Sequence, residues 1–249
     1  MATQLRDGSQ VEDPRLDLLR EYDERDDLYG VMEVIGGQGE PVTVAWPFPE
    51  GAEVLNQGKE GACVGFGCCN ELRCHPVPVL GLDATFARES IYWPAQRDDP
   101  WPGGAFPGAQ PFYEGTSVRA GVKQLVRMGY VGEYRWAKSE AEMALAISVG
   151  PIIIGVDWYQ GMYRPNSLGY LRPTGAKVGG HCCLVTGLKV TNKATGTGYY
   201  TIYNSWGPNW GNKGTARISR ADMRKLIDSG RGDACLITQR FNPPQPRTV

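Results

Sequence analysis

Hydrophobic and polar positions follow two different periods, one before residue 150 and another after it. Before it, four segments combine apolar faces of helical spacing with flanking stop signals, which predicts helices. They are VGFGCCNELRC (64–74), ATFARESIYWPAQR (84–97), SVRAGVKQLVRMG (117–129) and SEAEMALAISVG (139–150). After residue 150 the apolar runs are short, β-rich and separated by turns, which predicts strands. They are PIIIGVDWY (151–159), HCCLVTGLKV (181–190), GYYTIYNSW (198–206), GTARIS (214–219) and ACLITQRF (234–241).

Helices that precede strands indicate an α+β fold with two dissimilar halves. We assign residues 41–240 to one packed domain, with a helical half at about 55–135 and a β-rich half at about 136–240. Residues 98–115 are rich in Pro and Gly, which predicts a long ordered loop or an insertion. The end, residues 241–249, contains NPPQPRTV and is expected to be a loose tail.

The first forty residues form a separate acidic arm. They hold eleven acidic and four basic side chains, a net charge of −7, whereas the whole chain has a net charge of −1. Within the arm, Asp13 and Pro14 precede RLDLLREY, which predicts a short amphipathic helix. An acidic arm on a mildly basic body could dock in cis, bind a partner or remain a solvated tail.

Composition excludes several classes of protein. The chain of 249 residues is 41% hydrophobic and 21% charged, as in ordinary globular proteins. It has no apolar run near the roughly 18 residues that span a bilayer, so we expect no membrane segment. No apolar stretch follows basic residues at the N-terminus, so we expect no classical secretion signal. The near-zero net charge gives no reason to expect a nucleic-acid partner.

Seven cysteines is an odd number, and three of them lie on one predicted helix while two are adjacent on one predicted strand, which are poor geometries for disulfides among themselves. We therefore expect mostly reduced thiols and a reducing compartment. Cys68, Cys69, Cys74 and His75 lack the C-x-x-C spacing of a structural metal site or a haem attachment, so we expect no metal and no cofactor.

Three motifs occur in a specific order: NQGKEGAC with Cys63, GGHCCLVTG with His181, and NSWGPNWGNKG with Asn204. Together they resemble the papain-like (C1-type) cysteine peptidases over roughly residues 41–240. His181 follows Cys63 by 118 residues and Asn204 follows His181 by 23, close to the family's spacing of about 130–150 residues. The segment EGTSVRAGVKQLVRMGYV resembles the bacterial or phage-style branch of that family. The resemblance implies a papain-like fold, in which a cleft separates the helical half from an antiparallel, β-barrel-like half.

The resemblance also implies a catalytic mechanism. Cys63 begins a buried helix, whose N-terminus favours the thiolate, and His181 supplies an imidazolium that favours it further. His181 later protonates the leaving amine, while Asn204 orients its ring. The amide of Gln57 and the backbone N–H of Cys63 form the oxyanion hole.

The implied substrate contacts surround these groups. Trp206 covers the contact between histidine and asparagine, and Trp210 lines the leaving-group side. Gly115 and Thr116 belong to the substrate-side loop, and the small residues Gly155, Gly179 and Gly180 leave a pocket that is roomy or filled by other residues. Where many secreted members have a disulfide cysteine, this chain has Glu60.

The sequence therefore predicts a cysteine endopeptidase that hydrolyses peptide bonds through an acyl-enzyme intermediate. Two alternatives remain open: a papain-like structural or binding module of a larger, for example phage, assembly, and a peptidoglycan amidase or acyl transferase that uses the same triad. The arm is too short for the family's long helical propeptide, so it either has a reduced inhibitory role or the enzyme is made without a pro-form. We expect peptide or protein substrates, a possible larger assembly docked through the acidic arm, and a cytoplasmic or virion-associated location.

Overall fold

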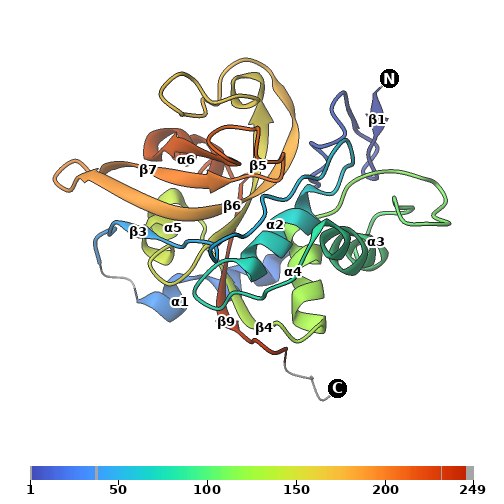
Figure 1. Ribbon diagram of the computed structural model, residues 1–249, viewed down its shortest axis with the longest axis horizontal. Helices are drawn as coiled ribbons and strands as arrows, with labels where there is room; N and C mark the ends of the chain where they lie inside the picture. Colours follow the sequence, from blue (N-terminus) through green and yellow to red (C-terminus); the bar gives the residue numbers. More distant parts are fainter. Residues whose placement is uncertain (1, 37–38, 231, 245–249) are drawn as a thin grey trace.

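The computed structural model describes residues 2–36, 39–230 and 232–244, and it divides into a helical side and a sheet side (Figure 1). The helical side contains α2 (Cys63–Arg73), the π-helix η2 (Phe86–Tyr92), α3 (Trp93–Asp98) and α4 (Val118–Arg127). These match three of the predicted helices, although the second begins as a π-helix. The fourth predicted helix, α5 (Glu140–Ala146), lies on the sheet side, and Ser139 caps it by accepting a hydrogen bond from the Glu142 N–H at 3.2 Å.

The sheet side is one antiparallel sheet with the strand order β4-β9-β5-β6-β7-β8. Its strands are β4 (Val131–Trp136), β9 (Asp233–Arg240), β5 (Ile152–Tyr159), β6 (Lys177–Asn192), β7 (Thr197–Tyr203) and β8 (Thr215–Ser219). The short strand β3 (Val44–Ala45) pairs with β6, and η3 (Gln160–Met162) follows β5. The predicted α+β fold is confirmed.

Two hydrophobic cores meet at the long strand β6. One core packs the sheet against α5 and α6 (Arg220–Ile227), and it contains Trp158, Tyr200 and Leu236. The other surrounds α2, all of whose residues are buried, and it contains Phe66 and Leu72. Because β6 contributes Cys183 to the first core and Cys182 to the second, side-chain alternation along one strand joins the two halves.

The N-terminal arm docks in cis and crosses from the helical side to the sheet side (Figure 1). It begins with the hairpin β1 (Thr3–Gln4) and β2 (Gln10–Val11), and it continues through η1 (Glu24–Tyr29) and α1 (Met32–Ile35). Carboxylates of Glu21, Asp23 and Asp26 pair with Arg119 of α4. The predicted helix after Asp13 is wrong: residues 16–20 contain isolated β-bridges and no helix, because their backbone groups bond to the body of the protein.

Besides the short β3 and η3, the sequence analysis missed β4 and α6 in the body of the protein. β4 lies in VGEYRW, where the apolar positions do not alternate, and α6 lies in RADMRKLI after the recognised strand β8. All seven cysteines are free and buried. Among the described residues, no helix is long and apolar enough to cross a membrane. Of the predicted C-terminal tail, residues 245–249 lie outside the described residues.

Candidate active site

Cys63 is the first residue of α2, at the base of the cleft between the two sides. The preceding turn is tight, and Gly58 there adopts φ 67°, which suits glycine. The Cys63 sulfur accepts a hydrogen bond from the backbone N–H of Cys182 at 3.3 Å, and Cys182 directly follows His181 on β6. The helix therefore holds the thiol against the strand that carries the histidine.

His181 and Asn204 are in direct contact. The Nε2 atom of His181 lies 2.8 Å from Oδ1 of Asn204. The same oxygen accepts the Ser205 N–H at 2.8 Å, which identifies it as the amide oxygen and makes Nε2 of His181 the donor. Trp206 covers this contact, with its ring centroid 5.0 Å from that of His181. The structure thus brings Asn204 against His181, which is the position needed to orient the imidazole.

Gln57 is fixed beside this pair, but its amide does not face the cleft. Its backbone N–H donates to the Ser205 carbonyl at 2.8 Å, and its Oε1 accepts from the Ser205 hydroxyl at 2.6 Å. Its Nε2 donates to the Glu60 carbonyl at 2.9 Å. The expected oxyanion donor is therefore engaged within its own loop while the arm is in place.

The arm occupies the cleft. Oδ1 of Asp17 accepts the Cys63 backbone N–H at 3.3 Å, so a carboxylate oxygen lies where the sequence analysis expected a developing oxyanion. Two residues before Asp17 in the arm, the Arg15 carbonyl lies 3.1 Å from Nδ1 of His181. The Cys63 N–H and Nδ1 of His181 are thus both occupied by the chain's own N-terminal segment.

Backbone pairing holds the arm on both walls of the cleft. The Leu18 N–H donates to the Gly180 carbonyl at 3.2 Å, and the Gly180 N–H donates to the Leu16 carbonyl at 3.4 Å. On the opposite wall, the Leu19 N–H donates to the Thr116 carbonyl at 3.0 Å. Thr116 and Gly180 are predicted substrate-binding residues, and here they bind the arm.

Burial shifts the catalytic groups toward their neutral forms. Desolvation raises the pKa of the Cys63 thiol well above its ordinary value, and the nearby Asp17 carboxylate raises it further. Desolvation lowers the pKa of His181 to about 4, although its acceptors Asn204 and the Arg15 carbonyl oppose this shift. The predicted thiolate and imidazolium are therefore disfavoured while the arm fills the cleft. The arm excludes water from both groups, the Asp17 carboxylate disfavours the thiolate, and the Arg15 guanidinium disfavours the imidazolium.

Two carboxyl groups, Asp17 of the arm and Glu114 of the body, meet at the Tyr92 hydroxyl near Cys63, and the sequence analysis did not find this cluster. The Tyr92 hydroxyl lies 2.9 Å from Oδ2 of Asp17 and 2.9 Å from Oε2 of Glu114, and it accepts the Gly115 N–H at 2.8 Å. Desolvation raises the pKa of Asp17 to about 6 and that of Glu114 to about 8. The only available signal was Glu114 itself, which precedes the recognised Gly115 and Thr116.

The predicted small-residue pocket exists, and the arm fills it. A Cβ atom added at Gly155 would lie 3.0 Å from Cδ2 of Leu18, and one added at Gly179 would lie 2.7 Å from Cβ of Leu16. Of the two alternatives for this pocket, other residues fill it. Gly115 lies close to the arm as well, since a Cβ there would lie 2.9 Å from the Asp17 carbonyl.

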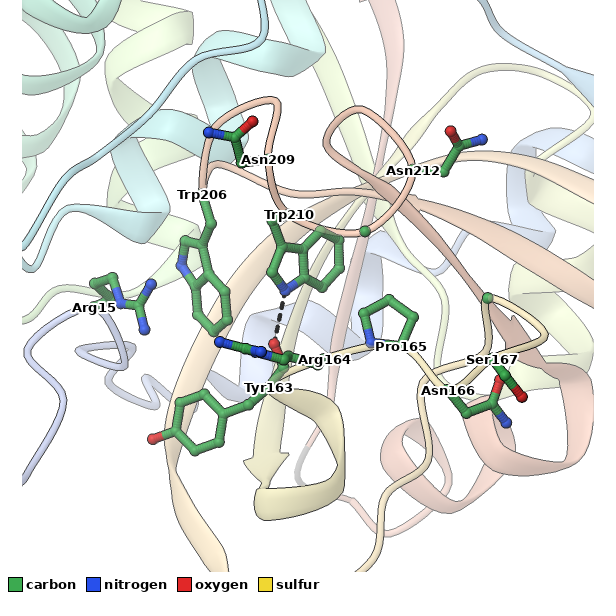
Figure 2. A pocket seen from close by; sticks show the side chains of 12 residues that line it. Arg15, Tyr163, Arg164, Pro165, Asn166, Ser167, Trp206, Asn209, Trp210 and Asn212 are labelled. Atoms are coloured by element: carbon green, nitrogen blue, oxygen red, sulfur yellow. Dashed lines mark hydrogen bonds between the residues drawn. The ribbon is translucent and has the colours of Figure 1, made fainter.

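An open pocket of about 880 Å³ is lined by both predicted tryptophans (Figure 2). Trp206 and Trp210 meet edge to face at 5.9 Å, and Nε1 of Trp210 donates to the Tyr163 carbonyl at 2.8 Å. The Arg15 guanidinium of the arm lies over the Trp206 ring, 4.0 Å from its centroid.

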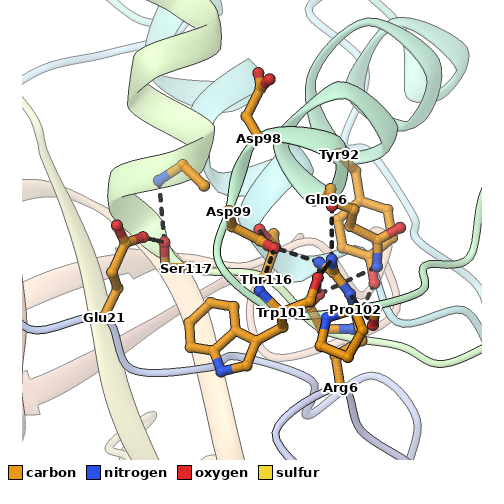
Figure 3. A network of polar contacts seen from close by, with 12 residues as sticks. Arg6, Glu21, Tyr92, Gln96, Asp98, Asp99, Trp101, Pro102, Thr116 and Ser117 are labelled. Atoms are coloured by element: carbon orange, nitrogen blue, oxygen red, sulfur yellow. Dashed lines mark hydrogen bonds and ion pairs between the residues drawn. The ribbon is translucent and has the colours of Figure 1, made fainter.

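A buried arginine anchors the arm outside the cleft (Figure 3). Arg6 donates to Oδ2 of Asp99 at 2.6 Å, to the Gln96 carbonyl at 2.6 Å and to the Gly115 carbonyl at 3.2 Å. It also donates to the Trp101 carbonyl and, at 3.2 Å, to the Pro102 carbonyl. The long loop 98–115 that the sequence predicted therefore supplies most of the groups that bind Arg6. No group of His, Cys, Asp and Glu side chains suited to a metal ion occurs among the described residues.

Comparison with known proteins identifies the class to which this fold and site belong. The family model of the papain family cysteine proteases matches residues 108–240, just over half of the chain. The chain therefore belongs to the papain family of cysteine proteases.

Individual relatives are distant. Cathepsin B-like cysteine proteinase 4 of Caenorhabditis elegans is 26% identical over 162 residues, which are 65% of this chain and 46% of that protein. Mexicain of Jacaratia mexicana is 31% identical over 116 residues, 46% of this chain and 49% of mexicain. The matched stretches thus span about half the length of these relatives.

Among solved structures, xylellain, a cysteine protease from Xylella fastidiosa, superimposes with a TM-score of 0.66 at 15% identity. The superposition covers 94% of this chain and 99% of xylellain. At this identity the likeness shows the fold, which is papain-like.

Proposed function

We propose that this chain is a cysteine peptidase whose own N-terminal arm closes the cleft in the resting state. The observation that carries this proposal is the contact of His181 with Asn204, next to the Cys182 N–H that binds the Cys63 sulfur. These three side chains come from α2, from β6 and from the residue that directly follows β7, and a purely structural module does not need them to converge.

Catalysis would begin once the arm has left. Water and substrate then replace the Asp17 carboxylate, so the thiol of Cys63 can transfer its proton to His181. The sulfur attacks the substrate carbonyl carbon, and the negative charge that develops on the carbonyl oxygen is met by the Cys63 N–H. His181 returns the proton to the leaving amine, and water hydrolyses the thioester with His181 as the base. Gln57 joins the oxyanion hole if its amide turns away from Glu60.

The closed state is inhibited rather than poised for self-cleavage. The group that meets the Cys63 N–H is the side-chain carboxylate of Asp17, which a thiol does not cleave. A substrate must therefore displace residues 15–19, or another event must loosen the arm before cleavage begins. Low turnover of the intact chain is thus expected, and this keeps the binding-module alternative open to test.

The experiment is labelling with an epoxysuccinyl peptide, which alkylates an activated cysteine. Wild type should react slowly at Cys63 alone, and Cys63→Ala should not react. Arg6→Ala removes the anchor of the arm, so it should accelerate labelling by about tenfold or more, because a buried ion pair is lost. Asp7→Ala, an exposed change in the same hairpin, is the matched control. A folded Arg6→Ala chain that stays unlabelled would favour the binding module.

Substrate class is decided by a second assay on the same variants. A labelled Arg6→Ala chain that cuts unstructured proteins is a peptidase. If it cuts cell-wall fragments or transfers acyl groups to amines instead, the amidase or transferase alternative is correct.

We also propose a bacterial or phage-style origin, a cytoplasmic or virion-associated location and a larger assembly as partner. The motif EGTSVRAGVKQLVRMGYV supports the origin, and the seven free cysteines support a reducing location. Tyr22 and Leu28 of the arm are 83% and 70% exposed, which supports a partner that binds the arm and pulls it from the cleft. A partner should therefore raise the labelling rate of Cys63, and one that binds without this effect would contradict the proposal.

A further inference from the structure

A second thiol lies beside Cys63, where α2 begins against β6. The backbone N–H of Cys182 donates to the Cys63 sulfur at 3.3 Å. Because the Cβ atom of Cys182 is only two covalent bonds from that nitrogen, it lies within about 6 Å of the same sulfur. Both side chains are buried in the core around α2. The nucleophile and a second cysteine therefore share one desolvated place in the molecule.

A missing side chain on α2 makes room for this second thiol. A Cβ atom added at Gly67 would lie 2.6 Å from the Cys182 sulfur, which is closer than unbonded atoms approach. Gly67 follows Cys63 by one helical turn, and residues at this spacing lie on the same face of a helix with about 5–6 Å between their Cβ positions. The Cys182 sulfur therefore lies on the face of α2 that carries the Cys63 side chain, one turn further along.

Two other nearby thiols point elsewhere. Side-chain alternation along β6 places Cys183 on the opposite face of the strand from Cys182, in the core of the sheet. The sulfur of Cys68 lies toward α4, since a Cβ atom added at Gly121 would be 2.9 Å from it. A disulfide needs two Cβ atoms about 3.5–4.5 Å apart, and a shift of at most a few ångströms brings those of Cys63 and Cys182 to that distance.

We propose that Cys182 is a redox modification site, which resolves the oxidised form of Cys63 by forming a reversible disulfide with it. This inference rests on the proposed function, since the arm must leave before an oxidant reaches the buried nucleophile. The oxidant is hydrogen peroxide. The Cys63 thiolate attacks one peroxide oxygen and the O–O bond breaks, so that a sulfenic acid forms and the other oxygen leaves, with a proton, as water. The Cys182 sulfur then attacks the sulfenic sulfur, a disulfide forms, and the hydroxyl group leaves with the thiol proton as a second water.

The disulfide would protect the nucleophile from permanent damage. Without a second thiol, further peroxide converts the sulfenic acid into a sulfinic acid, which a dithiol does not reduce. With Cys182 in place, oxidation removes two electrons from the pair of thiols and stops, and a dithiol reductant restores both. The enzyme would then be inactive under peroxide and active again after reduction.

The test compares Arg6→Ala, in which the arm is loosened, with the same chain carrying Cys182→Ala. Each reduced chain is treated with hydrogen peroxide until iodoacetamide no longer alkylates Cys63, and intact mass and peptide mapping locate the change. The chain that retains Cys182 should lose two hydrogens and yield a peptide pair linked through Cys63 and Cys182. After dithiothreitol it should recover about tenfold more alkylation than the Cys182→Ala chain, whose Cys63 should gain two oxygens.

Two further variants control for folding and for the loss of any thiol. Cys182→Ser keeps the size of the side chain, and it should behave like Cys182→Ala. Cys183→Ala removes the adjacent thiol on the other face of β6, and it should form the disulfide and recover like the parent chain.

Each outcome decides the proposal. A chain with both thiols whose Cys63 ends as a sulfinic acid, or remains a thiol throughout the treatment, would overturn it, as would a bond from Cys182 to Cys68 that leaves Cys63 out. Recovery that persists in folded Cys182→Ala would overturn the role of Cys182. Failure of the peptidase proposal appears separately, in the epoxysuccinyl and peptide assays on the reduced chain, because oxidation by peroxide requires no substrate.

Discussion

Two buried carboxylate clusters of this molecule are built in opposite ways. On the sheet side, Glu140 accepts hydrogen bonds from the Tyr200 hydroxyl at 2.7 Å, from Arg220 at 2.6 Å and from Arg224 at 2.9 Å. In the cleft, Asp17 accepts from the Cys63 N–H at 3.3 Å and lies 2.9 Å from the Tyr92 hydroxyl, which also serves Glu114. Both Glu140 and Asp17 are fully buried.

The two clusters differ in whether the buried carboxylate has a positively charged partner. Glu140 has two guanidinium groups, so its charge is compensated in the folded state. Asp17 and Glu114 share the Tyr92 hydroxyl as a hydrogen-bond partner and lie close to each other. Among the described residues neither forms an ion pair with a cation. The first cluster therefore stabilises the packing of α5 against α6. In the second cluster the ionised carboxylates of Asp17 and Glu114 would repel each other, which destabilises the docked arm at the place from which it must leave.

The largest effect is expected at the compensated cluster. Glu140→Ala leaves two arginines and a tyrosine without their acceptor, so the free energy of unfolding should fall by about 3–5 kcal/mol. Urea denaturation measures this change. Glu89→Ala, at an exposed acid of η2, should stay within about 0.5 kcal/mol. A small loss in Glu140→Ala would remove the contrast between the two clusters.

The second effect is a pH dependence of arm closure. The pKa of Asp17 is about 6 in the closed cleft against 3.8 ordinarily, and that of Glu114 is about 8 against 4.5. Both groups bind protons more tightly when the arm is closed, so closure is most stable below about pH 4 and weakens as pH rises through 6 and 8. For Asp17 alone the loss is on the order of 3 kcal/mol at most.

Amide hydrogen exchange of residues 13–20, corrected for the intrinsic pH dependence of exchange, should therefore accelerate between pH 5 and pH 8.5. Residues 152–154 of β5 should remain protected and serve as the internal control. Exchange that slows or stays constant over this interval would show that the uncompensated carboxyls do not govern the arm.

Asp17→Asn removes the negative charge of this side chain but keeps its size, so it shows whether the charge weakens closure of the arm. The amide oxygen can still accept the Cys63 N–H, but no carboxylate forms, so the arm should stay closed at high pH and labelling of Cys63 should be slower than in wild type at pH 8. The labelling rate of Cys63 in both chains is measured at pH 5 and at pH 8 by quenching the reaction at successive times. Faster labelling of Asp17→Asn at pH 8 would mean that the negative charge holds the arm in place.

The smallest effects are expected from removing the hydroxyl groups of Tyr200 and Tyr92, one in each cluster. Tyr200→Phe removes one of several donors to Glu140 and should cost about 1 kcal/mol of unfolding free energy. Tyr92→Phe should cost a similar amount, but it should appear as faster labelling of Cys63, because both cleft carboxyls and the Gly115 N–H lose their shared hydroxyl. If Tyr92→Phe lowers only global stability, the cleft cluster does not act on the arm.

Much of the fold was predictable because its signals are local. The period of SVRAGVKQLVRMG predicted α4, and the β-rich runs around Gly155 and His181 predicted β5 and β6. The helix predicted after Asp13 failed because propensity competes with tertiary hydrogen bonds: the Leu18 and Leu19 N–H groups pair with Gly180 and Thr116, which no local pattern reveals.

The sequence by itself predicted the candidate site, since Cys63, His181 and Asn204 lie in motifs whose order and spacing are specific. Only the tertiary structure decided the state of that site. Asp17 reaches Cys63 across 46 residues of chain, and Arg6 reaches Asp99 across 93. Such contacts depend on how two surfaces meet, and the desolvation that neutralises the thiol and the imidazole exists only after they have met.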